Sequence, residues 1–197
     1  MIYSIVKFIV SIFLRFLFRW KSVGMENIPS KGPVIIASNH LSFWDPPLIG
    51  CSLNRQIHFM AKEELFQIPI FGWIIRKLQA FPVKRGSADR NAIRKSLELL
   101  SQGGILGLFP EGTRSKTGKL GKAEPGLALI ALKSGAAIIP TAVKGTNQVL
   151  SKDCFLPRFE VCFGKPIYVE TARGDKEYLI YLSDKIMQEI AKLQSEG

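Results

Sequence analysis

The chain has few cysteines, and their spacing excludes several kinds of site. Its 197 residues include three cysteines, namely Cys51, Cys154 and Cys162. They are odd in number and lack the Cys-x-x-Cys spacing that is typical of zinc and redox sites. We therefore expect reduced cysteines that pack as ordinary side chains, with no metal and no resident cofactor. No Gly-x-Ser-x-Gly motif is present, which argues against a serine nucleophile of the hydrolase kind.

Acidic residues are also scarce. The chain carries 16 of them against 27 lysines and arginines, which gives a formal net charge of +11. A positive field of this size favours an anionic partner, such as nucleic acid, anionic lipid or an acidic carrier protein. The sequence has no arginine-rich arm, zinc spacing or aromatic strand motif of the nucleic-acid-binding modules. We therefore expect lipid or a carrier protein as partner, and no nucleic acid.

The chain lacks linkers, repeats and low-complexity tracts, so its length suits one domain. Apolar strand-like runs alternate with helical patterns, which predicts an α/β fold: a single layered domain with a mixed, partly parallel sheet flanked by helices. Strands are predicted at residues 20–25, 33–38, 56–61, 80–84, 104–109, 136–143, 159–163 and 167–169. Helices are predicted at residues 45–53, 66–78, 87–102, 124–134 and 175–194.

Residues 1–20 contain no acidic side chain and are mostly large and apolar. Their polar members recur every three or four positions, as one stripe of an α-helix does: Ser4, Lys7, Ser11, Arg15 and Arg19. Three cations along one face do not suit a spanning helix, so we expect a helix that lies in the membrane plane. A spanning helix and a buried core helix are the alternatives. The predicted organisation is a membrane-docking helix at residues 1–20 and a folded domain at residues 21–197.

A candidate base and its orienting carboxylate follow the buried strand predicted at 33–38. Residues 39–45 read Asn-His-Leu-Ser-Phe-Trp-Asp, and two prolines after them suit the first turn of a helix. His40 then leaves the carboxyl end of a strand, where open α/β sheets place their ligands. Asp45, near the helix N-cap, can hold one ring nitrogen protonated and leave the other free to accept a proton. The alternative is a polar loop that only caps the helix.

A second motif follows another buried run. Residues 109–115 read Phe-Pro-Glu-Gly-Thr-Arg-Ser, directly after the apolar residues 104–108. Together with residues 39–45, this stretch resembles two motifs of the PlsC-type glycerophospholipid acyltransferases, whose first motif has the form His-x-x-x-x-Asp. Two further motifs of that family are matched, in the right order, at residues 62–85 and 138–140. The resemblance covers roughly residues 23–169.

The resemblance implies an O-acyltransferase that acts on lysophosphatidic acid. It would move a fatty acyl chain from an acyl carrier protein or coenzyme A thioester to the sn-2 hydroxyl, by direct transfer. The thioesters are co-substrates, and the enzyme would lie on the cytoplasmic face of the cell membrane as a peripheral or monotopic protein. The alternatives are another acceptor (glycerol 3-phosphate, another lysophospholipid or an amino-lipid) or a non-catalytic lipid-binding module.

The residues also receive expected roles. His40 is the predicted general base, since an imidazole that titrates near neutral pH suits this work, and Asp45 orients it. The resemblance and the chemistry of phosphate recognition add candidate substrate-binding residues: Asn39, Ser42, Lys62, Arg85, Glu111, Gly112, Thr113 and Arg114. The alternative for Ser42 is a turn or cap, and for Lys62 and Arg85 a solvated charge. Glu111 would repel a phosphate, so we expect it to pair with an arginine or lysine.

Overall fold

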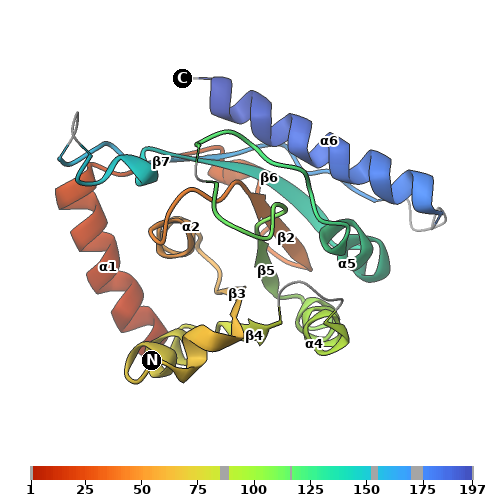
Figure 1. The fold of residues 1–197 in the computed structure, drawn as a ribbon, viewed down its shortest axis with the longest axis horizontal. Coiled ribbons are helices and arrows are strands. Elements are labelled where there is room, and N and C mark those ends of the chain that lie inside the picture. The colour runs from red at the N-terminus through yellow and green to blue at the C-terminus, as the bar shows by residue number, and fades with distance from the viewer. Residues whose placement is uncertain (1, 85–88, 116, 152–154, 170–174, 197) are drawn as a thin grey trace.

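Seven strands form one sheet in the computed structural model, which describes residues 2–84, 89–115, 117–151, 155–169 and 175–196. The strands are β1 Lys21–Val23, β2 Val34–Ser38, β3 Ile57–Lys62, β4 Phe81–Val83, β5 Ile105–Leu108, β6 Ala137–Lys144 and β7 Glu160–Phe163. Their order across the sheet is β1-β7-β6-β2-β5-β3-β4, and all neighbouring pairs are parallel except β6 with β7 (Figure 1). The expectation of a mixed, partly parallel sheet is confirmed.

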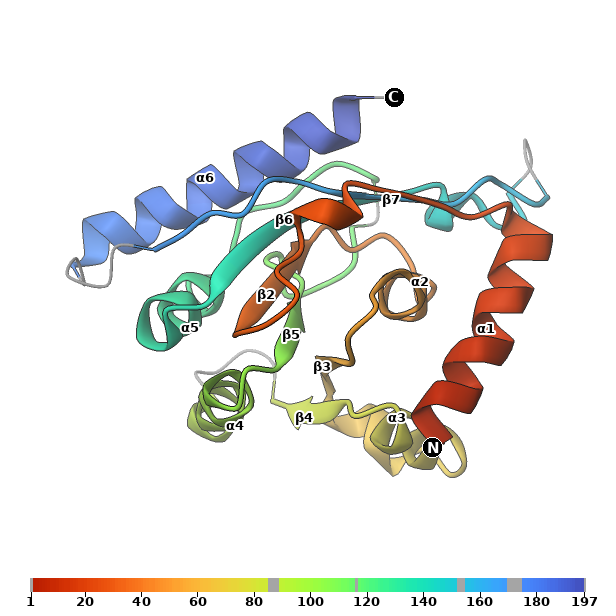
Figure 2. The same ribbon diagram turned by 180° about the vertical axis from the view of Figure 1, so that it is seen from behind.

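Helices cover both faces of this sheet (Figures 1 and 2). They are α1 Ile2–Phe18, α2 Asp45–Ser52, α3 Phe71–Lys77, α4 Arg90–Ser101, α5 Gly126–Ser134 and α6 Lys176–Ser195, with short 3₁₀ helices η1 Met25–Asn27, η2 Glu63–Gln67 and η3 Thr146–Gln148. Alternate residues of β2 face opposite layers: Val34 packs with α1 and α2, and Ile35 with α4, α5 and α6. Because helices cover both faces, the central strands are continuous apolar runs.

The region predicted as one helix at 66–78 is instead two short helices, η2 and α3. Between them, Ile70 has φ 63° and ψ −57°, and Phe71 donates its backbone N–H to Pro69 O at 2.6 Å. This is a γ-turn of the rare positive-φ kind, which is strained for a β-branched residue. Gly72 then passes under η2, where an added Cβ would lie 2.4 Å from Phe66 O. The turn therefore breaks the predicted helix.

Other predicted boundaries also need correction. Helix α4 begins at Arg90, because the Asp89 side chain caps it by accepting from the N–H groups of Asn91 and Ala92. The predicted start at residue 87 lies outside the described residues. The predicted strand at 167–169 is a single bridge between Ile138 and Ile167.

Helix α1 matches the helix predicted at 1–20, but its polar stripe is not simply turned outward. Lys7 donates from its Nζ to Leu53 O, and burial lowers the pKa of this amine. Leu14 and Phe18 are buried in the layer between α1 and the sheet. The opposite side of α1 exposes an apolar arc made of Ile2, Ile5, Phe8, Ile9, Ile12 and Phe16. None of the helices in the described residues is long and apolar enough to cross a bilayer.

Candidate active site

The candidate site lies at one edge of the sheet, where the carboxyl ends of β2, β5 and β6 meet. These strands are parallel, and β2 sits between the other two, with Ala37 opposite Leu108 and Ser38 opposite Thr141. Residues 39–45 follow β2, and residues 109–115 follow β5. The edge at the carboxyl ends of parallel strands is where open α/β sheets bind ligands. The sheet topology therefore brings the two sequence motifs together.

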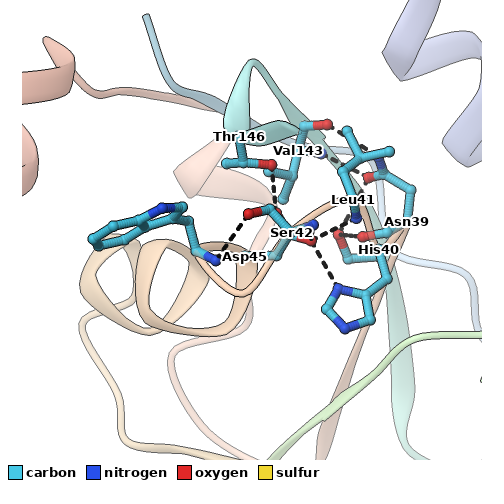
Figure 3. A network of polar contacts seen from close by, with 9 residues as sticks. Asn39, His40, Leu41, Ser42, Asp45, Val143 and Thr146 are labelled. Carbon is cyan, nitrogen blue, oxygen red and sulfur yellow. Dashed lines mark hydrogen bonds and ion pairs between the residues drawn. The ribbon is translucent and has the colours of Figure 1, made fainter. Parts of the chain in front are cut away.

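His40 and Asp45 form a buried pair. The Nδ1 of His40 lies 2.8 Å from Oδ2 of Asp45, and the residues are 8% and 0% exposed. Figure 3 shows the imidazole below the carboxylate, with its second nitrogen directed away from the network. The pair predicted from the spacing is therefore present in the structure.

The remaining neighbours of the Asp45 carboxylate are also hydrogen-bond donors. Oδ2 accepts from the backbone N–H groups of Leu41 and Ser42 at 2.6 and 2.7 Å, and Oδ1 accepts from the hydroxyl of Thr146 at 2.5 Å. An ionised carboxylate only accepts, so this arrangement places the His40 proton on Nδ1 and leaves Nε2 as the acceptor. Asp45 is the first residue of α2, one position after the N-cap Trp44, so the helix dipole also favours its charge.

Aromatic stacking holds the other side of the imidazole. The ring of Phe109 stacks on His40 with 3.9 Å between centroids and 15° between planes, and Phe59 stacks on Phe109 at 5.9 Å. Gly107 makes room for this column, since a Cβ there would lie 2.3 Å from the Phe59 ring. The backbone is tied as well, because Ser115 donates its N–H to His40 O at 2.8 Å. These contacts fix His40 in one orientation.

Asn39 and Ser42 lie near this pair and make hydrogen bonds to backbone groups. Asn39 is 0% exposed, and its amide donates to Val143 O at 3.0 Å and accepts from Val143 N at 2.7 Å. It therefore joins the loop after β2 to β6. The Oγ of Ser42 accepts from the N–H of Trp44 at 3.4 Å. This is the local turn contact that was the alternative role for Ser42. The nitrogen and the oxygen of the Asn39 amide thus each have a partner on Val143.

Glu111 does not have the partner that we expected. Its Oε2 accepts from the N–H of Gly121 at 2.8 Å, and its Oε1 is buried without a hydrogen-bond partner in the part of the chain that is described. The expected arginine or lysine pair is therefore wrong, because the side chain folds back to close its own loop. Gly112 supplies a turn at φ 65°, and Thr113 is exposed.

Arg114 lines an open pocket. Its guanidinium carbon is 3.7 Å from the centroid of the Phe43 ring, which is 64% exposed. The pocket has a volume of about 570 Å³, and its lining includes Ser42, Arg114 and Thr146. The structure therefore places a fixed positive charge beside the loop that carries His40.

Lys62, another predicted phosphate ligand, is not part of this cluster. Lys62 ends β3, which β5 separates from β2, and it forms an exposed ion pair with Glu64 at 3.0 Å. The structure thus has Lys62 as a solvated surface charge, which was the alternative to a phosphate ligand. Arg85 lies outside the described residues, so its predicted role stays a prediction.

Among the described residues, the other histidine and the two cysteines have surroundings unlike those of His40. Burial lowers the pKa of His58, whose Nδ1 contacts Gln79 O at 3.3 Å rather than a carboxylate. Burial raises the pKa of the Cys51 thiol, and burial together with the Glu160 carboxylate raises that of Cys162 to about 11. Within the described residues, no cluster of three or more His, Cys, Asp or Glu side chains could hold a metal ion.

Comparison with known proteins shows the family. A family model described as Acyltransferase matches residues 19–144, which is well over half of the chain. The chain belongs to the acyltransferase family. A chloroplastic 1-acyl-sn-glycerol-3-phosphate acyltransferase of Arabidopsis thaliana is 37% identical over 130 residues, which cover 64% of this chain and 36% of that member. The Bacillus subtilis 1-acyl-sn-glycerol-3-phosphate acyltransferase is 31% identical over 180 residues, 89% of this chain and 88% of that protein.

Further acyltransferases extend the comparison. A lyso-ornithine lipid O-acyltransferase of Pseudomonas aeruginosa is 34% identical over 112 residues, 56% of this chain and 43% of that enzyme. The crystal structure of the PlsC acyltransferase of Thermotoga maritima matches with a TM-score of 0.76 and 28% identity, covering 99% of this chain and 82% of that one. The chain spans little more than a third of the chloroplast relatives, 36% and 38% of their lengths. The α/β fold is therefore that of a solved member of the acyltransferase family.

Sequence reasoning missed the roles of two residues of the site, Thr146 and Phe109. Thr146 follows β6, and the rule about carboxyl ends that located His40 could have pointed to it. The stacking of Phe109 on His40 had no such signal, because the motif names this residue without saying where its ring lies. Both depend on strands that come together only in the folded sheet.

Proposed function

We propose that this protein transfers a fatty acyl chain from a thioester to the sn-2 hydroxyl of lysophosphatidic acid. The observation that carries the proposal is the His40–Asp45 pair, which leaves one ring nitrogen free to accept a proton. A lipid-binding module needs no oriented base, so the buried pair counts against the non-catalytic alternative. The names of the Arabidopsis and Bacillus relatives support the acceptor.

The proposed reaction needs only a base and a positioned acceptor. The Nε2 of His40 takes the hydroxyl proton as the acceptor oxygen attacks the thioester carbonyl carbon. The new ester C–O bond forms, the C–S bond breaks, and the departing sulfur takes the proton from the imidazolium. Asp45 stabilises that imidazolium and holds its tautomer. The products are phosphatidic acid and the free thiol of the carrier.

Direct transfer also agrees with the state of the described cysteines. A thiol nucleophile is activated by a lowered pKa or by an adjacent base. Burial instead raises the pKa of Cys51 and of Cys162, and neither thiol contacts His40 among the described contacts. Cys154 lies outside the described residues. The acceptor hydroxyl is therefore the proposed nucleophile.

Arg114 is the proposed ligand for the acceptor phosphate. A guanidinium that stacks on an aromatic ring keeps the N–H groups at its edge, which can bind two phosphate oxygens at once. Arg114 lies over Phe43 in this way and lines the open pocket beside the His40 loop. The donor is proposed to be an acyl carrier protein or coenzyme A thioester, and the net charge of +11 suits either anionic carrier.

The proposed place of action is the cytoplasmic face of the cell membrane. Both acceptor and product carry long acyl chains, so the site must reach the bilayer surface. Helix α1 exposes a row of large apolar side chains, and Arg15 and Arg19 are exposed beside them. Such a helix can lie in the interface with its apolar side among the acyl chains and its cations at the headgroups.

One observation favours a second acceptor class. The lyso-ornithine lipid relative shows that a similar domain is found in an enzyme whose name gives an amino-lipid as the acceptor. A lyso-amino-lipid lacks the phosphate that Arg114 is proposed to bind. A panel of lysophosphatidic acid, glycerol 3-phosphate, other lysophospholipids and a lyso-amino-lipid, with mass detection of products, separates the two proposals.

The decisive experiment is His40→Ala, assayed by thiol release with lysophosphatidic acid and each thioester donor. We expect the rate to fall by about 10²–10⁴-fold, the usual contribution of a general base. His58→Ala is the matched control, because it removes the other histidine of the chain and should leave the rate nearly unchanged. A folded His40→Ala variant that retains more than about a tenth of the rate would contradict the base assignment.

A further inference from the structure

The hydroxyl of Thr146 is a buried donor to the catalytic pair that no motif includes. Thr146 is 1% exposed, and its Oγ1 lies 2.5 Å from Oδ1 of Asp45, a residue 101 positions earlier in the chain. The family match ends at residue 144, so Thr146 lies just outside it. Figure 3 shows Thr146 reaching the carboxylate from the side opposite to His40.

The two oxygens of Asp45 have separate partners. Oδ2 accepts from His40 and from two backbone N–H groups, whereas Thr146 is the partner of Oδ1 among the described contacts. A carboxylate is planar, so a donor on one oxygen also sets the plane in which the other oxygen lies. Thr146 therefore acts together with the two backbone N–H groups in setting the position of Oδ2 beside the imidazole of His40.

The backbone around Thr146 is built to hold the hydroxyl in place. Gly145 has φ 82°, and an added Cβ there would lie 2.2 Å from Arg158 O, so a side chain at 145 would push the turn away. Two residues before it, at Val143, the hydrogen bonds with Asn39 join β6 to the loop that carries His40. The end of β6 is thus tied at two points to the loop after β2.

We propose that Thr146 is a positioning residue for the acyl transfer, acting through Asp45. The proposal rests on the function proposed above, in which His40 is the base. Without the hydroxyl, Oδ1 is left in a fully buried place with no donor, which is unfavourable for a charged carboxylate. Asp45 then turns, takes up a proton or admits water, and each of these weakens its hold on His40.

The test compares Thr146→Val with Thr146→Ser. Valine keeps the size of the side chain and removes the hydroxyl, whereas serine keeps the hydroxyl and removes a methyl group. We expect Thr146→Val to lower kcat by about 10- to 100-fold with little change in the KM for lysophosphatidic acid, since a hydrogen bond to a charged group is lost. Thr146→Ser should keep most of the activity. If Thr146 served only for packing, Thr146→Val would keep more of the kcat than Thr146→Ser.

Thr141→Val is the matched control. Thr141 is also a fully buried threonine of this region, but its hydroxyl donates to Ile139 O at 3.1 Å and does not touch Asp45. It should leave kcat nearly unchanged. A second measurement, proton NMR of the imidazole N–H of His40, should show a shifted or lost signal in Thr146→Val and the native signal in Thr141→Val. The signal can be assigned with His58→Ala.

The outcomes are distinct for the two proposals. If His40→Ala is inactive while a folded Thr146→Val keeps full kcat and the native imidazole signal, the positioning proposal is overturned and the base assignment stands. If a folded His40→Ala variant is active, the base assignment is overturned; if the native protein transfers no acyl chain to any acceptor of the panel, the function itself is overturned. If Thr146→Val does not fold, Thr146→Ala removes the same hydroxyl without added bulk and is judged by the same two measurements.

Discussion

At the scale of single residues, Arg114 shows how one side chain can be both fixed and available. Its guanidinium lies over the exposed ring of Phe43, three residues after His40, so it is positioned without a carboxylate partner in the described contacts. A cation held by a ring keeps its hydrogen-bond donors for a ligand. The same contact ties the loop after β5 to the loop after β2.

Arg114→Lys should separate charge from shape. Lysine keeps the positive charge but loses the planar pair of donors, so we expect the KM for lysophosphatidic acid to rise by about 10-fold. Steady-state kinetics with the acceptor varied at saturating thioester measures this. Arg158→Lys, at another exposed arginine, is the control and should leave this KM unchanged. An unchanged acceptor KM together with a raised donor KM would assign Arg114 to the thioester instead.

Single residues also show what the sequence could predict. The pairing of His40 with Asp45 was predicted because the two residues are only five positions apart, across a single turn of the chain. The contacts of Asn39 were not, because its partner Val143 lies 104 residues away and becomes a neighbour only when β2 and β6 pair. Glu111 was given the wrong partner because its Oε2 accepts instead from a backbone N–H ten residues later. Spacing alone does not reveal such loop closures.

At the scale of elements, the turn between η2 and α3 has a strained backbone and exposed apolar side chains. Ile70 sits at positive φ and is 76% exposed, and Trp73 nearby is 57% exposed. The sequence predicted one helix here because the residues are apolar at helical spacing. It could not show that Gly72 passes under Phe66 O, a packing contact that forces the backbone to turn first. Most other strands and helices were predicted to within a few residues.

Ile70→Gly should stabilise the protein. Glycine adopts positive φ freely, so the change relieves about 1–3 kcal/mol of strain and costs about 0.5–1 kcal/mol in unfolded-chain entropy. We expect the free energy of unfolding to rise by about 1 kcal/mol in urea titrations. Ile68→Gly is the control, because Ile68 has φ −71° and gains nothing from glycine, so it should be destabilised. Equal destabilisation of both variants would show that the turn is unstrained.

At the scale of the whole molecule, α1 is coupled to the catalytic loop by aromatic rings. Trp44, the residue before Asp45, stacks on Phe13 at 5.8 Å and lies 5.4 Å from the Phe18 ring. The stripe of polar residues predicted the helix correctly but could not show which side of it meets the domain. Lys7 turned out to face inward, and Leu14 is buried. Removing α1 would therefore disturb Trp44 as well as any membrane contact.

A cleaner test changes only the exposed arc. Phe8, Ile9 and Phe16 are 67%, 58% and 79% exposed, so serine at all three should leave the fold intact. We expect binding to anionic phosphatidylglycerol vesicles in co-sedimentation to weaken by about 100-fold, from the lost apolar burial in the bilayer. Activity on a short-chain, water-soluble acceptor should be kept.

Serine at Ile180 and Tyr181, exposed at 53% and 57% on α6, is the matched control for this triple variant. It removes apolar side chains from another surface and should leave vesicle binding unchanged. If both sets of changes weaken binding equally, the attraction is not specific to α1. If the triple variant binds vesicles as the native protein does, α1 is not the membrane contact.

The place of β1 in the sheet has a consequence for the order in which the protein is made. Within the described strands, β1 pairs with β7 alone, and the Asn27 amide that follows it bonds to Phe163 O, 136 residues later. At a synthesis rate of about 5–20 residues per second, this partner leaves the ribosome roughly 7–27 s after β1. The stacking of Phe18 on Phe159 is delayed in the same way, because Phe159 is also synthesised late. Helix α1 is therefore available to a bilayer while translation continues, before Phe159, which contacts Phe18 at its end, has been made.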